Sequence, residues 1–168
     1  TGTLTCNIME FKKFSTSTAG FCVMDEENNI EAENVDTPID FVENPHGLIF
    51  KQKKDLKAAV GDYYHADFKG IQEVMLHLAI CHTVVIDKNK GVYNAASPDE
   101  LALVDGAKAE GYEFVGREAD NMIVIRDSQG YTLRYQVLNV LAFNSTRNRM
   151  SVSMLNQQNG YIELYSKC

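Results

Sequence analysis

The strongest structural signal in the chain lies in residues 131–165, which read YTLRYQVLNVLAFNSTRNRMSVSMLNQQNGYIELY. Three runs in it are rich in β-branched and aromatic residues, which favour strands: Tyr131–Leu141, Arg149–Leu155 and Tyr161–Tyr165. Residues 156–160 separate the last two runs with NQQNG, whose asparagines and glycine are typical of a tight turn. This region therefore predicts consecutive strands joined by short connections.

The same pattern extends upstream, where Tyr112–Val115 and Met122–Arg126 are predicted strands and Asp127–Gly130 is a predicted turn. Consecutive strands with such short connections pair antiparallel. Apolar residues at helical spacing predict a helix over Gly70–Cys81 and a weaker, shorter one over Asp55–Val60. Helices followed by a run of strands predict an α+β fold, in which helices flank a twisted antiparallel sheet.

A third helix is predicted to begin at Ser97, because residues 97–100 read SPDE. Serine is a good N-cap, proline suits the first helical position, and Glu100 stands where it completes a capping box. Gly111 is predicted to end this helix. In this interpretation Glu100 bonds to its own helix, which explains its presence without a ligand.

The composition excludes several classes of protein. The 168 residues carry 16 Lys and Arg against 23 Asp and Glu, and this net charge of −7 argues against non-specific nucleic-acid binding. We expect no secretory signal and no membrane helix, which needs about 20 apolar residues. The four cysteines form no Cys-x-x-Cys pair, so we expect reduced thiols and no metal site. Residues 14–50 hold eight acids and no Lys or Arg, which predicts an acidic, partly irregular segment.

Two stretches bear on phosphate binding. Residues 1–5 read TGTLT, and a Thr-Gly-Thr turn suits a phosphoryl oxygen because glycine lets the backbone approach closely. Residues 106–111 read GAKAEG and have the glycine spacing of a Walker loop, but Tyr112 stands where that loop needs lysine. A nucleotide bound by this chain would therefore be held without a glycine-rich phosphate loop.

Several stretches together resemble one family. Residues 1–5 resemble the phosphorylation motif of P-type ATPases, in which Asp-Lys precedes Thr-Gly-Thr-Leu-Thr, and the residues after them are similar to the type IV subfamily, the phospholipid flippases. SPDELALV at 97–104 resembles the flippase stretch SPDEAALV, and FNSTRNRMSV at 143–152 resembles FNSTRKRMSV. Residues 78–84 and 164–168 are also similar to flippase sequences. The resemblance thus runs from one end of the chain to the other.

Three residues depart from the flippase pattern. Leu101 replaces an alanine, Asn148 replaces a lysine, and Cys168 stands where a glycine is expected. The missing lysine at Asn148 would have supplied a positive charge, so the resemblance predicts one contact fewer on the phosphate side of a bound nucleotide.

The resemblance implies the nucleotide-binding domain of a phospholipid-translocating P-type ATPase. Residues 1–13 would be a remnant of the phosphorylation motif and hinge, 14–50 the acidic segment, and 51–168 the nucleotide-binding α+β core. The implied partners are ATP with Mg²⁺, the phosphorylation and actuator domains, a membrane accessory subunit and the phospholipid substrate. The parent would be an integral membrane enzyme that hydrolyses ATP, with this soluble domain on the cytosolic face. The nucleophilic Asp is expected outside this sequence, so we expect the chain alone to be inactive.

The resemblance also implies roles for individual residues. Phe143 would stack on adenine, although its alternative is to continue the apolar face of its own strand. Lys167 would reach the nucleotide, or else be a solvated residue near the end of the sequence. Glu100 would lie in the nucleotide pocket, where a carboxylate can accept a hydrogen bond from the adenine amino group.

Two further candidates concern the phosphates. Arg149, together with Arg147, would face the phosphates or lie on the solvent side of a strand. Thr1 would sit beside the acylphosphate of the intact enzyme. No catalytic residue is expected within the chain itself.

Two alternatives come from other classes of protein. A haloacid-dehalogenase-type phosphatase fragment is suggested by Gly-Thr-Leu-Thr, but the β-rich half lacks the alternation of strand and helix that such a hydrolase needs. The other is a non-catalytic interaction domain that uses the acidic segment at 14–50 and binds no nucleotide.

Overall fold

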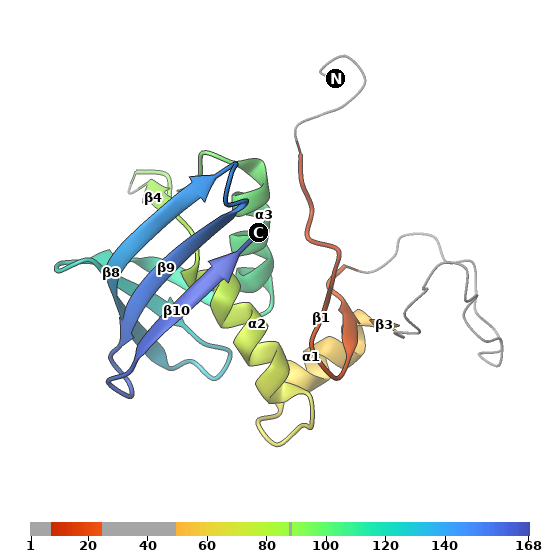
Figure 1. The fold of residues 1–168 in the computed structure, drawn as a ribbon. Helices are drawn as coiled ribbons and strands as arrows, with labels where there is room; N and C mark the ends of the chain where they lie inside the picture. The colour runs from red at the N-terminus through yellow and green to blue at the C-terminus, as the bar shows by residue number, and fades with distance from the viewer. Residues whose placement is uncertain (1–7, 25–49, 88) are drawn as a thin grey trace, which may run out of the picture. The chain divides into compact units, whose positions relative to one another are not determined.

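The computed structural model of the chain describes residues 8–24, 50–87 and 89–168. Contacts divide the chain into two compact units, one formed by Phe11–Gln72 and the other chiefly by Glu73–Cys168. Each unit combines helices with strands, so the predicted α+β class is confirmed (Figure 1). Helix α2 (Phe68–Ile80) contributes its first residues to one unit and the remainder to the other.

The unit of residues 11–72 contains a small sheet of three strands: β1 (Lys13–Ser15), β2 (Gly20–Cys22) and β3 (Phe50–Lys51). Strands β1 and β2 are antiparallel, and β3 joins β2 in parallel. The rings of Phe14 and Phe21 stack with centroids 5.4 Å apart and form its core. The sequence did not predict β1 and β2, and residues 25–49 of the acidic segment lie outside the described residues.

The other unit is built on a five-stranded antiparallel sheet, ordered β10-β9-β8-β7-β6. Its strands are β6 (Glu113–Glu118), β7 (Met122–Arg126), β8 (Thr132–Asn144), β9 (Arg149–Asn156) and β10 (Ile162–Lys167). All five predicted strands are confirmed. Each strand pairs with the next in sequence because short turns join them. Gly130 and Gly160 adopt the positive φ angles of 84° and 75° expected of turn glycines.

The predicted helices are also present. Helix α1 (Lys53–Gly61) extends the predicted helix Asp55–Val60 at both ends. Helix α2 begins two residues before the predicted helix Gly70–Cys81 and ends one residue before it does. Helix α3 (Pro98–Ala109) begins after Ser97, and Gly111 follows its C-terminus at a φ of 92°. A short hairpin of β4 (Val85–Asp87) and β5 (Val92–Asn94) was not predicted, because three-residue strands are too short to show an alternating pattern.

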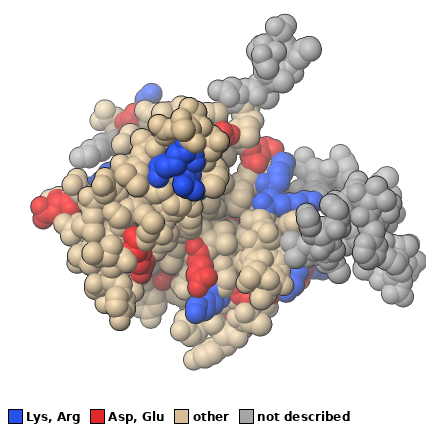
Figure 2. All heavy atoms as spheres, viewed as in Figure 1, with Lys and Arg blue, Asp and Glu red and all other residues tan. Residues whose placement is uncertain are grey.

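The two faces of the five-stranded sheet differ in their surroundings. Met150, Val152 and Met154 of β9 are buried, on the face that packs against helices. On the other face Leu141 and Leu164 are 46% and 68% exposed. Figure 2 views the molecule from the side of β8, β9 and β10, and the surface over these strands is mostly uncharged. Among the described helices, none has both the length and the apolar character needed to cross a membrane.

His82 is a buried histidine in the turn after α2 and is 1% exposed. Its Nε2 donates to the carbonyl of Ala79 at 2.7 Å, and its Nδ1 accepts from the N–H of Val84 at 3.0 Å. These two bonds require a neutral ring with its proton on Nε2. Burial lowers the pKa of His82 from 6.5 to about 4. His82 is therefore part of the core.

We predict that acid destabilises the chain through His82. A buried base whose pKa is lower in the folded than in the unfolded protein stabilises the fold fully above pH 6.5 and less as the pH falls toward 4. Urea denaturation should show a loss of about 2 kcal/mol between pH 7 and pH 5, from ~1.36 kcal/mol per pKa unit. His65→Gln, at a less buried histidine, should keep this pH dependence. His82→Leu should remove most of it, the remainder coming from His77, whose pKa burial also lowers. An undiminished loss in the His82→Leu variant would contradict the assignment.

Candidate functional site

The site begins with an ion pair between two residues far apart in sequence. Glu100 lies in the first turn of α3, and Lys167 is the last residue of β10. The Lys167 Nζ lies 3.1 Å from Oε1 of Glu100. Their side chains are 23% and 10% exposed, respectively, so the pair is largely withdrawn from water. The lysine is thus held in the fold rather than solvated at the end of the chain.

The turn after α2 supplies the remaining partner of Glu100. Thr83 donates its backbone N–H to Oε1 at 3.1 Å and its hydroxyl to Oε2 at 3.0 Å. Burial disfavours the charged carboxylate, but the hydrogen bonds from Thr83 and the charge of Lys167 outweigh it, so the pKa of Glu100 lies below its usual value. The carboxyl is therefore ionised and held from two sides.

The predicted capping box at Ser97 and Glu100 is wrong. The Ser97 hydroxyl makes no capping hydrogen bond, and the Glu100 carboxylate accepts from Thr83 and Lys167 instead. The tertiary donors prevail because a charged lysine and two donors from one residue hold a buried carboxylate better than a single backbone N–H does.

Phe143 lies near the end of β8, with strand β9 between it and Lys167. A bulge between Leu141 and Asn144 sets residues 142 and 143 opposite Met150, and Met150 pairs with Lys167 on its other side. The bulge interrupts the alternation after Leu141. Counted back from the Asn144–Arg149 pair, Phe143 falls on the face of Met150 and Lys167. The Phe143 side chain is 62% exposed, so its ring is accessible instead of being packed in the core.

Arg149 is a predicted site residue that does not lie on this face. Arg149 precedes Met150 on β9 and pairs with Asn144, so strand alternation directs its exposed side chain to the opposite face. Thr1 lies outside the described residues. The structure therefore brings together Phe143, Glu100 and Lys167.

Arg147 holds the hairpin between β8 and β9 in shape. Its Nη2 donates to the carbonyls of Leu141, Ala142 and Arg149 at 3.0, 3.3 and 2.9 Å, and its Nη1 donates to the hydroxyl of Ser151 at 3.3 Å. These four acceptors occupy most of its donors. The hypothesis that Arg147 faces the phosphates is thus replaced by a structural role.

Asn148 lies at the tip of this hairpin with a φ of 53°. Asparagine is one of the few residues other than glycine that readily adopts this left-handed conformation. The turn thus gives a conformational reason for asparagine where the flippase pattern has lysine.

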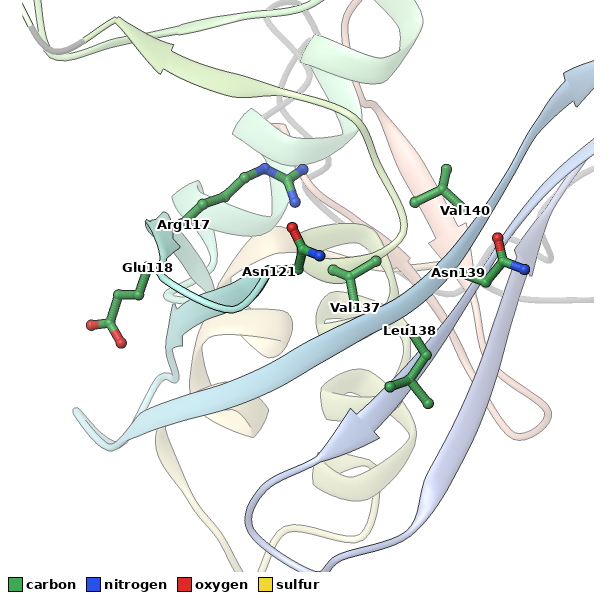
Figure 3. Close-up of a pocket in the computed structure, with 7 residues that line it drawn as sticks. All are labelled: Arg117, Glu118, Asn121, Val137, Leu138, Asn139 and Val140. Carbon is green, nitrogen blue, oxygen red and sulfur yellow. The ribbon is translucent and has the colours of Figure 1, made fainter.

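A cavity of about 360 Å³ lies on the same unit, lined by residues of β6, β8 and the turn after β6. Figure 3 shows the side chains of Arg117 and Asn121 directed toward Val137 and Val140, whereas Glu118 points away from them. The Arg117 Nη2 also lies 3.5 and 3.4 Å from the carbonyls of His82 and Val84, which flank Thr83. Arg117 thus connects the cavity to the Glu100 site, because its guanidinium lies against the backbone carbonyls on both sides of Thr83.

Thr83 and Arg117 were not predicted as site residues from the sequence. Thr83 lies within residues 78–84, which carried part of the flippase resemblance, so that stretch held a signal. Arg117 lies two residues beyond the predicted strand Tyr112–Val115, in the part of β6 that was not predicted, and nothing in its sequence context indicates that its side chain points inward.

No protein-family model matches the chain. It is 39% identical over 170 residues to the phospholipid-transporting ATPase DRS2 of Saccharomyces cerevisiae, 38% over 171 residues to the phospholipid-transporting ATPase IK of Mus musculus, and 36% over 187 residues to DNF2 of the same yeast. These alignments cover 99%, 99% and 90% of this chain. The chain belongs to the type IV P-type ATPases. It spans 12%, 12% and 11% of the length of these three relatives.

In this type IV P-type ATPase chain, the stretches that carried the resemblance converge in space. Thr83 comes from residues 78–84, Glu100 from 97–104 and Lys167 from 164–168, and the three side chains are joined by hydrogen bonds. Residues 143–152 supply Phe143 and Met150 beside them. Four segments separated in sequence thus form one site.

We predict that Arg147→Met lowers the free energy of unfolding by about 1–2 kcal/mol, because the hairpin carbonyls lose a charged donor. Chemical denaturation measures this. Arg149→Met is the matched control, since Arg149 is exposed two residues away, and it should change stability by less than about 0.5 kcal/mol. Equal effects of the two substitutions would contradict the bracing role of Arg147.

Proposed function

We propose that the chain is the ATP-binding domain of a phospholipid-translocating P-type ATPase and presents ATP to a phosphorylation domain elsewhere in the protein. The observation that carries this proposal is the accessible ring of Phe143 on the face of the sheet that also carries Lys167 and its partner Glu100. An exposed aromatic ring next to one carboxylate and one ammonium matches a purine base, which has a flat apolar face and a polar edge.

The three residues would divide the recognition of ATP between them. Phe143 would stack on the adenine, a contact worth ~1–3 kcal/mol. Glu100, held ionised, would accept from the adenine amino group, and Lys167 would donate to the base edge or the phosphates. Thr1 and Arg149 remain proposed contacts of the phosphate end, although Arg149 would have to reach the phosphates around the hairpin end of β9 because it lies on the opposite face of the sheet. One stack and two polar contacts, set against the freedom lost on binding, predict a dissociation constant on the order of millimolar.

The parts of the reaction divide between this chain and the rest of the parent. In a P-type ATPase the γ-phosphoryl group passes to an aspartate, which we expect outside this chain, and Mg²⁺ neutralises the phosphate charge. Among the described residues, no three His, Cys, Asp or Glu side chains cluster closely enough to hold a metal ion. Mg²⁺ would therefore arrive with the phosphates of ATP. The chain binds and orients the nucleotide and is proposed to be inactive alone.

The remaining partners follow from the parent. They are the phosphorylation and actuator domains, a membrane accessory subunit and the phospholipid. The proposed location is the cytosolic face of a membrane. The antiparallel sheet, ordered β10 to β6, supports this assignment over a haloacid-dehalogenase-type phosphatase, which needs strands that alternate with helices.

An NMR titration of the 168-residue chain with Mg²⁺-ATP tests the proposal. Amide signals should shift in a cluster around Phe143, Met150 and Lys167, with half-saturation in the millimolar range. The absence of any shift at tens of millimolar ATP would favour an interaction domain that binds no nucleotide.

We predict that Phe143→Ala lowers the affinity for ATP more than tenfold, because the stacking surface is lost. The melting temperature should change little, since the ring is 62% exposed. Leu164→Ala is the control: Leu164 is 68% exposed on the opposite face of the sheet, and its loss should change ATP affinity less than twofold. Equal affinities of wild type and Phe143→Ala would refute the stacking role.

A further inference from the structure

Thr83 is an exposed residue whose hydrogen bonds orient the buried carboxylate of Glu100. It follows α2 by three positions, and its own side chain is exposed. Its hydroxyl nevertheless bonds Oε2 of Glu100 at 3.0 Å while its N–H bonds Oε1 at 3.1 Å. Two donors from one residue thus fix both oxygens of the carboxylate and the plane in which they lie.

The backbone around Thr83 is itself held on both sides. The His82 ring accepts from the N–H of Val84 and donates to the carbonyl of Ala79. Arg117 lies within 3.5 Å of the carbonyls of His82 and Val84. These bonds fix the backbone of Thr83. The two hydrogen bonds from Thr83 then fix the position of the Glu100 carboxylate.

The two oxygens of Glu100 are used unequally. Oε1 accepts from the Thr83 N–H and from Lys167, whereas among the described residues Thr83 Oγ1 is the sole donor to Oε2. A carboxylate oxygen accepts two hydrogen bonds, so Oε2 retains capacity for one more. Without the hydroxyl, the carboxylate would keep its bonds at Oε1 and could rotate about that point.

We propose that Thr83 is a positioning residue that sets the base preference of the site by aiming Oε2 of Glu100 at the base edge. This inference rests on the proposed nucleotide-binding function. An ionised carboxylate only accepts, so it favours the 6-amino group of adenine and repels the carbonyl oxygen that guanine carries at that position. A carboxylate that rotates away loses this discrimination.

The experiment compares ATP and GTP binding to the 168-residue chain by NMR titration. Wild type should prefer ATP by about tenfold or more, since the guanine carbonyl oxygen would face Oε2 of Glu100 with no proton between the two acceptors. Thr83→Val keeps the side-chain size and the backbone N–H but removes the hydroxyl. It should weaken ATP binding about fivefold to tenfold and lower the ATP-to-GTP preference by a similar factor. Thr83→Ser restores the hydroxyl and should stay within about twofold of wild type. Thr132→Val, at an exposed threonine of β8, is the matched control and should change neither value.

The base preference separates positioning from a general structural role. Equal losses of ATP and GTP affinity in Thr83→Val, or no loss at all, would overturn the proposal for Thr83 while leaving the nucleotide site intact. If wild type binds neither nucleotide, the proposed function itself fails and the preference proposed for Thr83 falls with it. The hold on Glu100 is tested separately by its carboxyl titration in the nucleotide-free chain: the midpoint should be higher in Thr83→Val than in wild type and Thr83→Ser, and equal midpoints would overturn it.

Discussion

A buried carboxylate can remain charged in a folded protein only if donors surround it, and Glu100 meets this condition with donors from two separate segments of the chain. Thr83 holds it from the turn after α2, and Lys167 holds it from the end of β10. The pair thereby ties α3 to the last strand of the sheet. The proposed site depends on this one charged contact, since it places an acceptor and a cation at fixed positions beside Phe143.

The sheet supplies the rest of the site by geometry. Three neighbouring strands bring Phe143, Met150 and Lys167 into one row. The bulge in β8, next to the β8–β9 hairpin, places Phe143 opposite Met150 in that row. Arg147 closes the hairpin by bonding its carbonyls. The purine would therefore meet a rigid platform, and no glycine-rich loop is required. Weak, base-directed binding of this kind would suit the proposed function, in which the domain presents the phosphate end of ATP to another part of the protein.

Departures from the flippase pattern become intelligible in the fold. Asn148 occupies a left-handed turn position that asparagine tolerates well, so its presence has a conformational reason alongside the loss of a lysine charge. The two arginines on either side of it have different surroundings. Arg147 donates hydrogen bonds to backbone carbonyls, and Arg149 is exposed on the face of the sheet opposite to Met150. Equal spacing in the sequence therefore did not mean equal roles.

The sequence alone determined the five strands of residues 113–167, helices α2 and α3 and the family, because these follow from local periodicity, turn residues and motifs that neighbouring residues carry together. It also named Phe143, Glu100 and Lys167. Only the tertiary structure decided what Glu100 does. A capping box is a local contact that four residues can predict, whereas the bonds to Thr83 and Lys167 join positions 17 and 67 residues away. The same holds for Arg117, whose inward direction depends on the bulge in β6 and on a turn that packs against it. Side-chain contacts across the fold are set by packing between distant segments, so no single stretch of the sequence predicts them.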